Sequence, residues 1–353
     1  MSAAMLAAAN LGPVQWIGLA LVLPFSLLLT AAARRHALAH QVLDLPNARS
    51  SHVLPTPRGG GIAIVLSFLA AVAVLAVSGT VSPAVAVAHL GAGLLVAAVG
   101  FVDDLRGLSA RWRLLAHFAA AAWALYWLGV ANLAHALPLP LWLLLPLAAV
   151  ALAWLLNLYN FMDGIDGLAG IEALTVAGSL ALLAAWAGSG ELAVLALALA
   201  LAAAGFLRWN WPPAKIFMGD VGSGFVGCAF GLLLLQAAAE PRLLWAGVLL
   251  LGVFIVDATV TLLRRLLRGE RAGEAHRSHA YQRAARRLRS HRSVSLTVAA
   301  INLCWLLPLA AALASGRLAA LPALLVAWLP LLALAFALGA GLPDRHEAPA
   351  RAV

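Results

Sequence analysis

Residues 139–157 read LPLWLLLPLAAVALAWLLN, without one charged side chain, and the polar stretch 158–170, LYNFMDGIDGLAG, follows at once. A membrane-spanning helix needs ~20 mainly apolar residues. The first stretch therefore predicts a span, and the second predicts a loop at the membrane surface. The same alternation of apolar block and polar turn runs through all 353 residues.

The composition agrees with this pattern. Hydrophobic residues make up 64% of the chain and charged residues 10%, and the mean hydropathy is +0.96. Soluble proteins are roughly half apolar and about a quarter charged, so a soluble enzyme, a disordered chain and a disulfide scaffold are excluded. Cys228 and Cys304 lie inside apolar blocks and form neither a disulfide framework nor a zinc set. We expect an all-α polytopic membrane protein that forms one integral-membrane domain over residues 1–353.

Eleven membrane-spanning helices are predicted, with Pro and Gly marking many of their edges. Their expected ranges are 14–33, 60–77, 83–102, 112–130, 139–157, 171–187, 192–207, 222–239, 243–263, 294–314 and 320–338.

The positive-inside rule predicts the orientation. One side holds 21 of the 23 Lys and Arg residues, and the other holds only Arg242 and Arg317. We expect the protein to lie in a bacterial inner membrane with its basic side facing the cytoplasm. The N-terminus is then outside the cell membrane and the C-terminus is in the cytoplasm. The loops of the basic side are 34–59, 103–111, 158–170, 208–221 and 264–293, and almost every unusual polar residue lies in them.

Asp103 and Asp104 are adjacent in the second inner loop. Mg²⁺ is a hard cation that binds one or two carboxylates together with substrate phosphate oxygens. The pair is typical of such a site, although a solvated helix end would also carry it.

The third inner loop holds Asn157, Asn160, Asp163 and Asp166. The two amides and the two carboxylates are each spaced three apart, which places each pair on one face if the segment is helical. A plain Asp-Gly turn would explain one Asp-Gly pair but not two that follow two asparagines. We interpret this stretch as functional.

The fourth inner loop has a glycine-rich turn around Phe217 and Asp220. Such turns into a helix present backbone N–H groups to phosphates. In the first inner loop Arg58 precedes three glycines, a pattern that resembles an anion-binding turn.

The last inner loop contains His276, Arg277, His279 and Arg283 within a longer run of arginines. Arg binds phosphate with two parallel hydrogen bonds, and we select these four residues as candidates. The flanking arginines are interpreted as resting on anionic lipid headgroups. A histidine zinc site is an alternative, but carboxylates and amides in the other loops suit Mg²⁺ better.

Taken together, these loops resemble the polyprenyl-phosphate N-acetylhexosamine-1-phosphate transferase family, the WecA/MraY group. The resemblance covers residues ~44–283 and consists of five motifs in family order. They are Pro-Asn-Ala-Arg49-Ser-Ser-His52 with Pro-Thr-Pro-Arg58-Gly-Gly-Gly, Asp103-Asp104, Asn157-x-x-Asn160-x-x-Asp163-Gly-x-Asp166-Gly, Phe217-Met-Gly-Asp220-x-Gly-Ser, and the histidine-containing last inner loop.

The resemblance implies a UDP-N-acetyl-sugar donor, an undecaprenyl-phosphate acceptor, Mg²⁺ (with Mn²⁺ as an alternative) and UMP as the leaving product. By the same resemblance, Asp220 with Asn160 looks like the metal site. Asp103 and Asp104 resemble the pair that activates the lipid phosphate or supports the metal. Asp166 and Phe217 look like the uracil contacts.

The last-loop histidines and arginines resemble pyrophosphate binders, but the third histidine of well-known UDP-GlcNAc-using members is missing. The sequence His276-Arg-Ser-His279-Ala-Tyr-Gln-Arg283 looks more like the O-antigen branch that uses N-acetylfucosamine or N-acetylquinovosamine. UDP-GlcNAc stays open as the donor. A lipid-linked sugar product would initiate O-antigen or a related cell-surface polysaccharide. A homodimer stays open, and no nucleic-acid partner is expected.

The main alternative is a transporter of a phosphorylated or anionic solute. Transporters place ionisable residues near the middle of the bilayer, whereas here the predicted spans are nearly free of charge. Asp257 is the clear exception. We expect it either to reach the inner site or to pair with an arginine.

Overall fold

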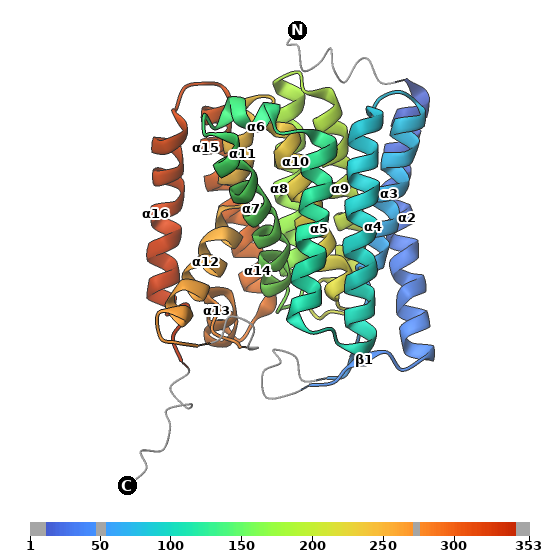
Figure 1. Ribbon diagram of the computed structural model, residues 1–353. Helices are drawn as coiled ribbons and strands as arrows, with labels where there is room; N and C mark the ends of the chain where they lie inside the picture. Colours follow the sequence, from blue (N-terminus) through green and yellow to red (C-terminus); the bar gives the residue numbers. More distant parts are fainter. Residues whose placement is uncertain (1–11, 47–53, 271–275, 344–353) are drawn as a thin grey trace.

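The computed structural model describes residues 12–46, 54–270 and 276–343 and is almost entirely helical within them (Figure 1). Arg49 and His52, which belong to the first sequence motif, lie outside the described residues. The first half contains α2 (Pro13–Ala39), β1 (Leu43–Asp44), β2 (Thr56–Pro57), α3 (Ile62–Val77), α4 (Pro83–Arg106), α5 (Ala110–Leu128), α6 (Ala131–Ala136), α7 (Leu141–Met162) and α8 (Leu168–Trp186). The second half contains α9 (Gly190–Asn210), α10 (Asp220–Ala237), α11 (Pro241–Leu250), α12 (Gly252–Leu266), α13 (Ala280–Leu288), α14 (His291–Ala300), the π-helix η1 (Ile301–Leu306), α15 (Leu307–Ala314) and α16 (Ala320–Leu338).

The prediction of an all-α polytopic membrane protein is confirmed. Eight of the described helices are long and apolar enough to cross a membrane, or nine if the bent pair α11 and α12 forms one span. Helices are suited to this role because every backbone polar group in a bilayer must find its partner within the protein. A helix occurs at each of the eleven predicted stretches, but length and composition support eight or nine crossings, so the count of eleven stays a prediction.

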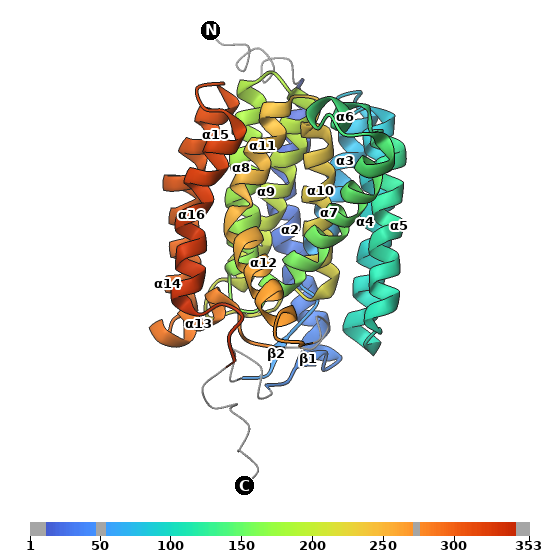
Figure 2. The ribbon, with the colours of Figure 1, turned by 60° about the vertical axis from the view of Figure 1, so that its left-hand side comes forward.

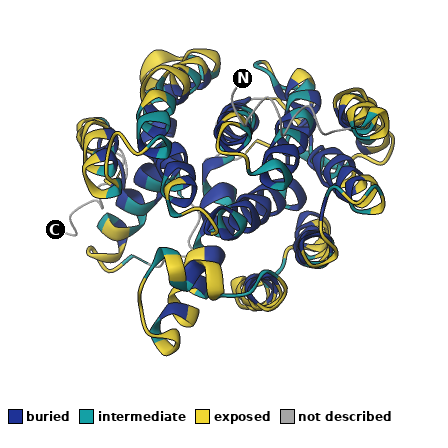
Figure 3. Cartoon of the chain, turned by 90° about the horizontal axis from the view of Figure 1, so that it is seen from above, coloured by how far each residue is buried: buried dark blue, intermediate teal, exposed yellow. Residues whose placement is uncertain are grey.

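Helix α10 lies at the centre of the bundle. In its apolar window 83% of the residues are buried, and buried residues gather in the middle of the bundle in Figure 3. The share is 22% in α2 and in α16, which lie at opposite edges in Figure 1. Glycines make this packing close. A Cβ built on Gly61 would lie 2.3 Å from the Cα of Gly222, and one on Gly227 would lie 2.6 Å from the carbonyl oxygen of Leu155. Small residues let membrane helices approach in this way, and here they bring α3 and α7 against α10.

The predicted span 243–263 is wrong as one continuous helix. It is divided into α11 and α12, which meet at Leu251 with a bend of 65°. The bend occurs where Trp328 packs: its indole lies where a Cβ of Gly252 would be, and its N–H donates to the carbonyl of Leu249 (3.4 Å). Helix α12 therefore packs against α7, α13 and α16 (Figure 2).

Several predicted loops are shorter than expected because the helices continue into them. Helix α4 includes Asp103 and Asp104 in its last turn, and α7 includes Asn157 and Asn160. The stretch 264–293, expected to be a loop, contains α13. These polar residues can remain helical because they lie at helix ends or face the interior of the bundle. We call the end of the bundle where α4 and α7 end and α10 begins the motif end; it is the lower end in Figure 1.

Candidate active site at the motif end

The predicted motif loops gather around one cavity of about 230 Å³, which we call the main cavity. Its lining residues are Asp44, Arg58, Asp104, Asn160, Asp163, Gly164, Ile165, Asp166, Asn210, Phe217, Gly219, Asp220, Ser223 and Gln282. Seven of the thirteen site residues selected from sequence are among them. The cavity therefore joins residues from all five inner loops, which are far apart in the chain.

Backbone pairing brings Arg58 and Phe217 together. The N–H of Phe217 donates to the carbonyl of Pro57 (2.8 Å), and the N–H of Gly60 donates back to the carbonyl of Phe217 (2.9 Å). Arg58 also donates from its guanidinium to the backbone carbonyl of Asp104. Proline in the first loop and glycine in both loops permit this close approach, and an arginine and an aromatic ring consequently line the same cavity.

Asp104 caps the N-terminus of α10 from the neighbouring helix α4. Its Oδ1 accepts from the N–H of Asp220 (3.1 Å) and its Oδ2 accepts from the N–H of Val221 (3.0 Å). The first N–H groups of a helix have no partner within the helix, and a carboxylate also interacts favourably with the helix dipole. Asp104 is thus placed to position Asp220.

Asp103, in the same last turn of α4, has different hydrogen-bond partners. Its Oδ2 accepts from Arg113 Nη1 (2.9 Å), and its Oδ1 accepts from the N–H of Leu108. Arg113 Nη1 also lies 3.7 Å from Asp220 Oδ2. Arg113, which the sequence analysis counted only as a basic residue, therefore connects the two carboxylates. Its position close after the Asp-Asp motif was the available signal.

Asp220 is held from α7 as well. Asn160 Nδ2 donates to Asp220 Oδ1 (2.6 Å) and to Ser223 Oγ (3.1 Å). The predicted association of Asn160 with Asp220 is therefore seen as a hydrogen bond. It brings the third and fourth motifs into direct contact.

Negative charge accumulates around Asp163, directly after the last residue of α7. Burial, reinforced by the carboxylates of Asp220, Asp104 and Asp166, raises the pKa of Asp163 well above its usual range. Such clustering is relieved when a cation binds. The cavity thus has the electrostatic character of a cation site.

The donor set is compatible with Mg²⁺ once substrate is present. Within residues 12–46, 54–270 and 276–343, no three His, Cys, Asp or Glu side chains converge into a ready-made metal site. Mg²⁺ does not need one, because it commonly uses one or two carboxylates and completes its shell with water and phosphate oxygens. Asp220, Asp163 and the amide of Asn160 offer oxygen ligands of this kind.

Asp166 and Asn210 connect the third inner loop to the fourth through hydrogen bonds. The N–H of Ala214 donates to Asp166 Oδ2 (3.0 Å), and Asn210 accepts from the N–H of Gly167 (2.9 Å) while donating to the carbonyl of Ile216 (2.9 Å). The sequence analysis missed Asn210. Its place at the end of a span, just before two prolines, was the only local signal.

Asn157 does not line the main cavity. Its Nδ2 lies 3.0 Å from His117 Nδ1 and donates to the carbonyl of Ala153 (2.7 Å). It borders a second cavity of about 250 Å³ between α4, α5, α7 and α10, which we call the apolar groove. Its lining combines apolar residues such as Val96, Leu114, Leu156 and Leu262 with polar ones, which are Asp103, Arg113, His117, Asn157, Asn160 and Asp220.

Asn160 and Asp220 line both cavities. The main cavity and the apolar groove therefore meet at the same pair of side chains. A polar substrate and a hydrocarbon chain can approach this pair from different sides.

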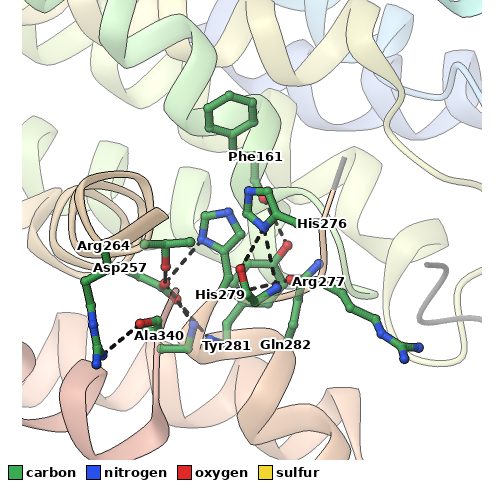
Figure 4. A network of polar contacts seen from close by, with 12 residues as sticks. Phe161, Asp257, Arg264, His276, Arg277, His279, Tyr281, Gln282 and Ala340 are labelled. Atoms are coloured by element: carbon green, nitrogen blue, oxygen red, sulfur yellow. Dashed lines mark hydrogen bonds and ion pairs between the residues drawn. The ribbon is translucent and has the colours of Figure 1, made fainter. Parts of the chain in front are cut away.

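The last-loop candidates lie beside the main cavity and not in its lining. His279 Nδ1 is 3.2 Å from Asp257 Oδ1, and the His279 ring stacks between those of His276 and Tyr281 (Figure 4). Asp257 therefore pairs with a histidine, and the expected arginine partner is wrong. Gln282, which the sequence analysis did not select, is the residue of α13 that lines the cavity.

The two arginines of this set have backbone contacts. Arg283 donates to the carbonyls of Leu342 and Pro343. The carbonyl of Arg277 accepts from Arg286 (3.0 Å), and the Arg277 side chain points away from the Asp257–His279 pair (Figure 4). Burial, followed by the charges of His279 and Arg265, lowers the pKa of His276 to about 3. In this arrangement His276 is neutral, and its ring packs against the ring of His279.

Comparison with known proteins extends these observations. A model of glycosyl transferase family 4 matches residues 85–238. A probable undecaprenyl-phosphate N-acetylglucosaminyl 1-phosphate transferase from Bacillus subtilis (strain 168) is 30% identical over 283 residues, which cover 77% of this chain and 77% of the relative. A decaprenyl-phosphate N-acetylglucosaminephosphotransferase from Mycobacterium leprae is 31% identical over 297 residues, covering 73% of each chain. A phospho-N-acetylmuramoyl-pentapeptide-transferase from Moorella thermoacetica is 32% identical over 229 residues, covering 59% of this chain and 69% of the relative.

These relatives share sequence with the chain well beyond its motif loops, across most of the helical bundle that holds them. The resemblance inferred from the motifs is therefore confirmed: the chain belongs to the WecA/MraY group of polyprenyl-phosphate N-acetylhexosamine-1-phosphate transferases within glycosyl transferase family 4.

Proposed function

We propose that the protein transfers an N-acetylhexosamine-1-phosphate from a UDP-sugar to undecaprenyl phosphate and releases UMP. The observation that carries this proposal is the meeting of the main cavity and the apolar groove at Asn160 and Asp220. A soluble nucleotide sugar fits the polar cavity, and the isoprenoid tail of the acceptor fits the groove. The family membership supports the same general reaction and leaves the transporter alternative without support.

The reaction brings two phosphorylated substrates together. An oxygen of the acceptor phosphate attacks the phosphorus attached to the sugar, and the bond from that phosphorus to the oxygen of UMP breaks. Negative charge must be neutralised while the reacting groups are held in line. Arg58 in the main cavity and Arg113 in the groove carry positive charge to the two sides of this reaction.

Each carboxylate has a separate proposed part. Asp163 and Asp220, with Asn160, would hold Mg²⁺ or Mn²⁺, which supplies charge stabilisation to the phosphates. Asp104 holds the start of α10 in place, and Asp103 orients Arg113 toward the groove. Phe217 and Asp166 lie at the nucleotide side of the cavity, where an aromatic ring stacks on uracil.

The donor and the pathway are the finer parts of the proposal. The names of the first relatives make UDP-GlcNAc the first donor to test. The departure in the last inner loop keeps UDP-N-acetylfucosamine and UDP-N-acetylquinovosamine in the same panel. A lipid-linked product suits the start of O-antigen or a related surface polysaccharide on the inner membrane, with the motif end cytoplasmic and the N-terminus outside.

The test uses the purified full chain with undecaprenyl phosphate, Mg²⁺ and this donor panel, and it measures UMP against UDP. We expect lipid-dependent UMP release that is lost in Asp220→Asn and retained in Glu240→Gln, a carboxylate removed from the start of α11. Release of UDP would show ordinary glycosyl transfer and would overturn the proposal. So would turnover that persists without a polyprenyl phosphate.

A further inference from the structure

A third cavity lies behind the Asp257–His279 pair, on the side of α12 away from the apolar groove. Its volume is about 280 Å³, and α12, α13, α14, η1 and α16 enclose it. Its apolar lining includes Val253, Val256, Ala284, Val298, Ile301 and Leu334. We call it the rear cavity. Its volume is near the lower end for ligand pockets, ~300 Å³, and apolar cavities favour apolar ligands over water.

The rear cavity is accessible from the outer edge of the bundle. Leu288 and Leu334, which line it, are 57% and 45% exposed, and Thr297 is also exposed. Helix α16, which forms one wall, lies at the edge of the molecule (Figures 1 and 2). In a membrane, this edge faces lipid hydrocarbon.

One arginine lines the rear cavity, in a segment of the chain that is rich in arginine. Arg287 is exposed, lines the cavity and makes a long hydrogen bond to the carbonyl of Leu338 (3.4 Å). Arg283, Arg286, Arg289 and Arg292 follow the same stretch of chain, and residues 276–343 contain no Asp or Glu. Arginine near a membrane surface attracts anionic lipid. The charge is therefore complementary to a phosphate and not to an amine.

Asp257, the acidic residue in the lining of the rear cavity, already has hydrogen-bond partners within the protein. Asp257 accepts from the N–H of Ala280 and of Tyr281 (both 2.9 Å) and from Thr261 Oγ1 (3.1 Å), in addition to its contact with His279. Its carboxylate consequently does not need a polar ligand. An occupant with a long apolar part is favoured.

We propose that the rear cavity binds an acyl chain of an anionic membrane phospholipid, with the lipid phosphate on Arg287. The bound lipid contacts Ala280 and Tyr281 at the start of α13, the turn that holds His279. Tyr281 Oη donates to the carbonyl of Phe161 (3.0 Å), between Asn160 and Asp163. Lipid binding therefore stabilises the contact of α13 with α7 beside the active site.

The test measures lipid binding directly, so it does not depend on the proposed function. Native mass spectrometry of the detergent-purified full chain compares phosphatidylglycerol with phosphatidylcholine. We expect phosphatidylglycerol to be retained preferentially and Arg287→Gln to weaken it about five- to tenfold. Arg287→Lys should keep most of the affinity, and Arg292→Gln, which removes a nearby arginine outside the lining, should leave it almost unchanged.

A second pair of variants tests the cavity itself. Ala284→Phe fills the rear cavity and should abolish retention of phosphatidylglycerol, whereas Ala337→Phe adds the same side chain at an exposed position of α16 outside the lining. Thermal unfolding in detergent shows that each variant is folded. A phosphatidylglycerol with a photoreactive acyl chain should crosslink to α13 and α16.

Three outcomes would overturn the proposal. Equal retention of the two phospholipids would exclude a phosphate-binding Arg287. An equal effect of Arg287→Gln and Arg292→Gln would show diffuse attraction to the basic surface. Crosslinks confined to α4, α5 and α7 would place the lipid in the apolar groove.

Discussion

The N-termini of α10 and α13 are capped in the same way but have different surroundings. At the start of α10, Asp104 of α4 accepts from two successive backbone N–H groups. At the start of α13, Asp257 of α12 does the same. A carboxylate from a neighbouring helix therefore caps each of these two helices. Acidity alone does not make either residue a catalytic group, because both of its oxygens already accept hydrogen bonds from the helix.

The difference lies in what surrounds each cap. Beside Asp104 four further carboxylates line an open cavity, and burial together with Asp220, Asp104 and Asp166 raises the pKa of Asp163. Beside Asp257, His279 and Thr261 complete the pairing, and the adjoining rear cavity is apolar. A surplus of negative charge in an open cavity distinguishes a cation-binding site from a helix junction.

The largest expected effect is that of Asp220→Asn, which removes charge from the open site. We expect the rate of UMP release to fall by about 10²–10³-fold or more, as when one electrostatic contact to a transition state is lost. Steady-state kinetics with varied Mg²⁺ measure it. A loss of less than tenfold would remove Asp220 from the proposed metal site.

Replacing each of the two capping aspartates by asparagine tests the comparison most directly. Asn can accept through only one atom, so Asp104→Asn and Asp257→Asn each leave one helix N–H unpaired, at a cost of about 1–3 kcal/mol. Both variants should unfold at lower temperature. Asp104→Asn should reduce kcat by about 10²-fold because it misplaces Asp220, and Asp257→Asn should reduce it less.

If Asp257→Asn instead retained full stability and activity, its role as a cap for α13 would be wrong. If it reduced kcat as strongly as Asp104→Asn, the distinction between the two sites would be lost. Glu240→Gln serves as the control for removal of an acidic group from the start of α11.

Helix packing around α10 gives a smaller effect. Gly61→Ala would place its Cβ 2.3 Å from the Cα of Gly222, and overpacking of this kind costs about 1–3 kcal/mol. We expect a lower unfolding temperature with partial loss of activity. Gly178→Ala, where a Cβ meets nothing within 4 Å, is the matched control and should leave both unchanged.

The smallest effect is a pH dependence of stability. The raised pKa of Asp163 means that the folded protein holds this proton more tightly than the unfolded chain. Without divalent cations, the contribution of Asp163 to stability should therefore fall as pH rises from the ordinary Asp pKa of 3.8 toward the raised value. Added Mg²⁺ should restore stability most strongly at the upper end of that window.

Thermal unfolding at several pH values, with and without Mg²⁺, measures this effect. Asp163→Asn should flatten the profile and reduce the Mg²⁺ response. Identical pH profiles for the wild type and Asp163→Asn in the absence of cations would contradict the assignment of surplus negative charge to the main cavity.

Hydropathy alone is sufficient to predict the helical membrane class and most helix positions of this chain. Apolar blocks of spanning length can satisfy their backbone only as helices, so α16, for example, lies where the run 320–338 was predicted. The motif order likewise indicated the family, and Arg58, Asn160, Asp163 and Asp220 were identified from residue type and spacing before their contacts were seen.

Which polar residues share a cavity depends on contacts between helices that are far apart in the chain. Asp104 and Asp220 lie 116 positions apart, and Asn160 and Asp220 lie 60 apart, so no local pattern pairs them. At the bend, Trp328 from α16 packs against Gly252 and donates to Leu249, and α12, after this bend, presents Asp257 to α13. The bilayer determines where helices form, whereas close packing between distant helices determines whether a carboxylate caps a helix or faces an open site.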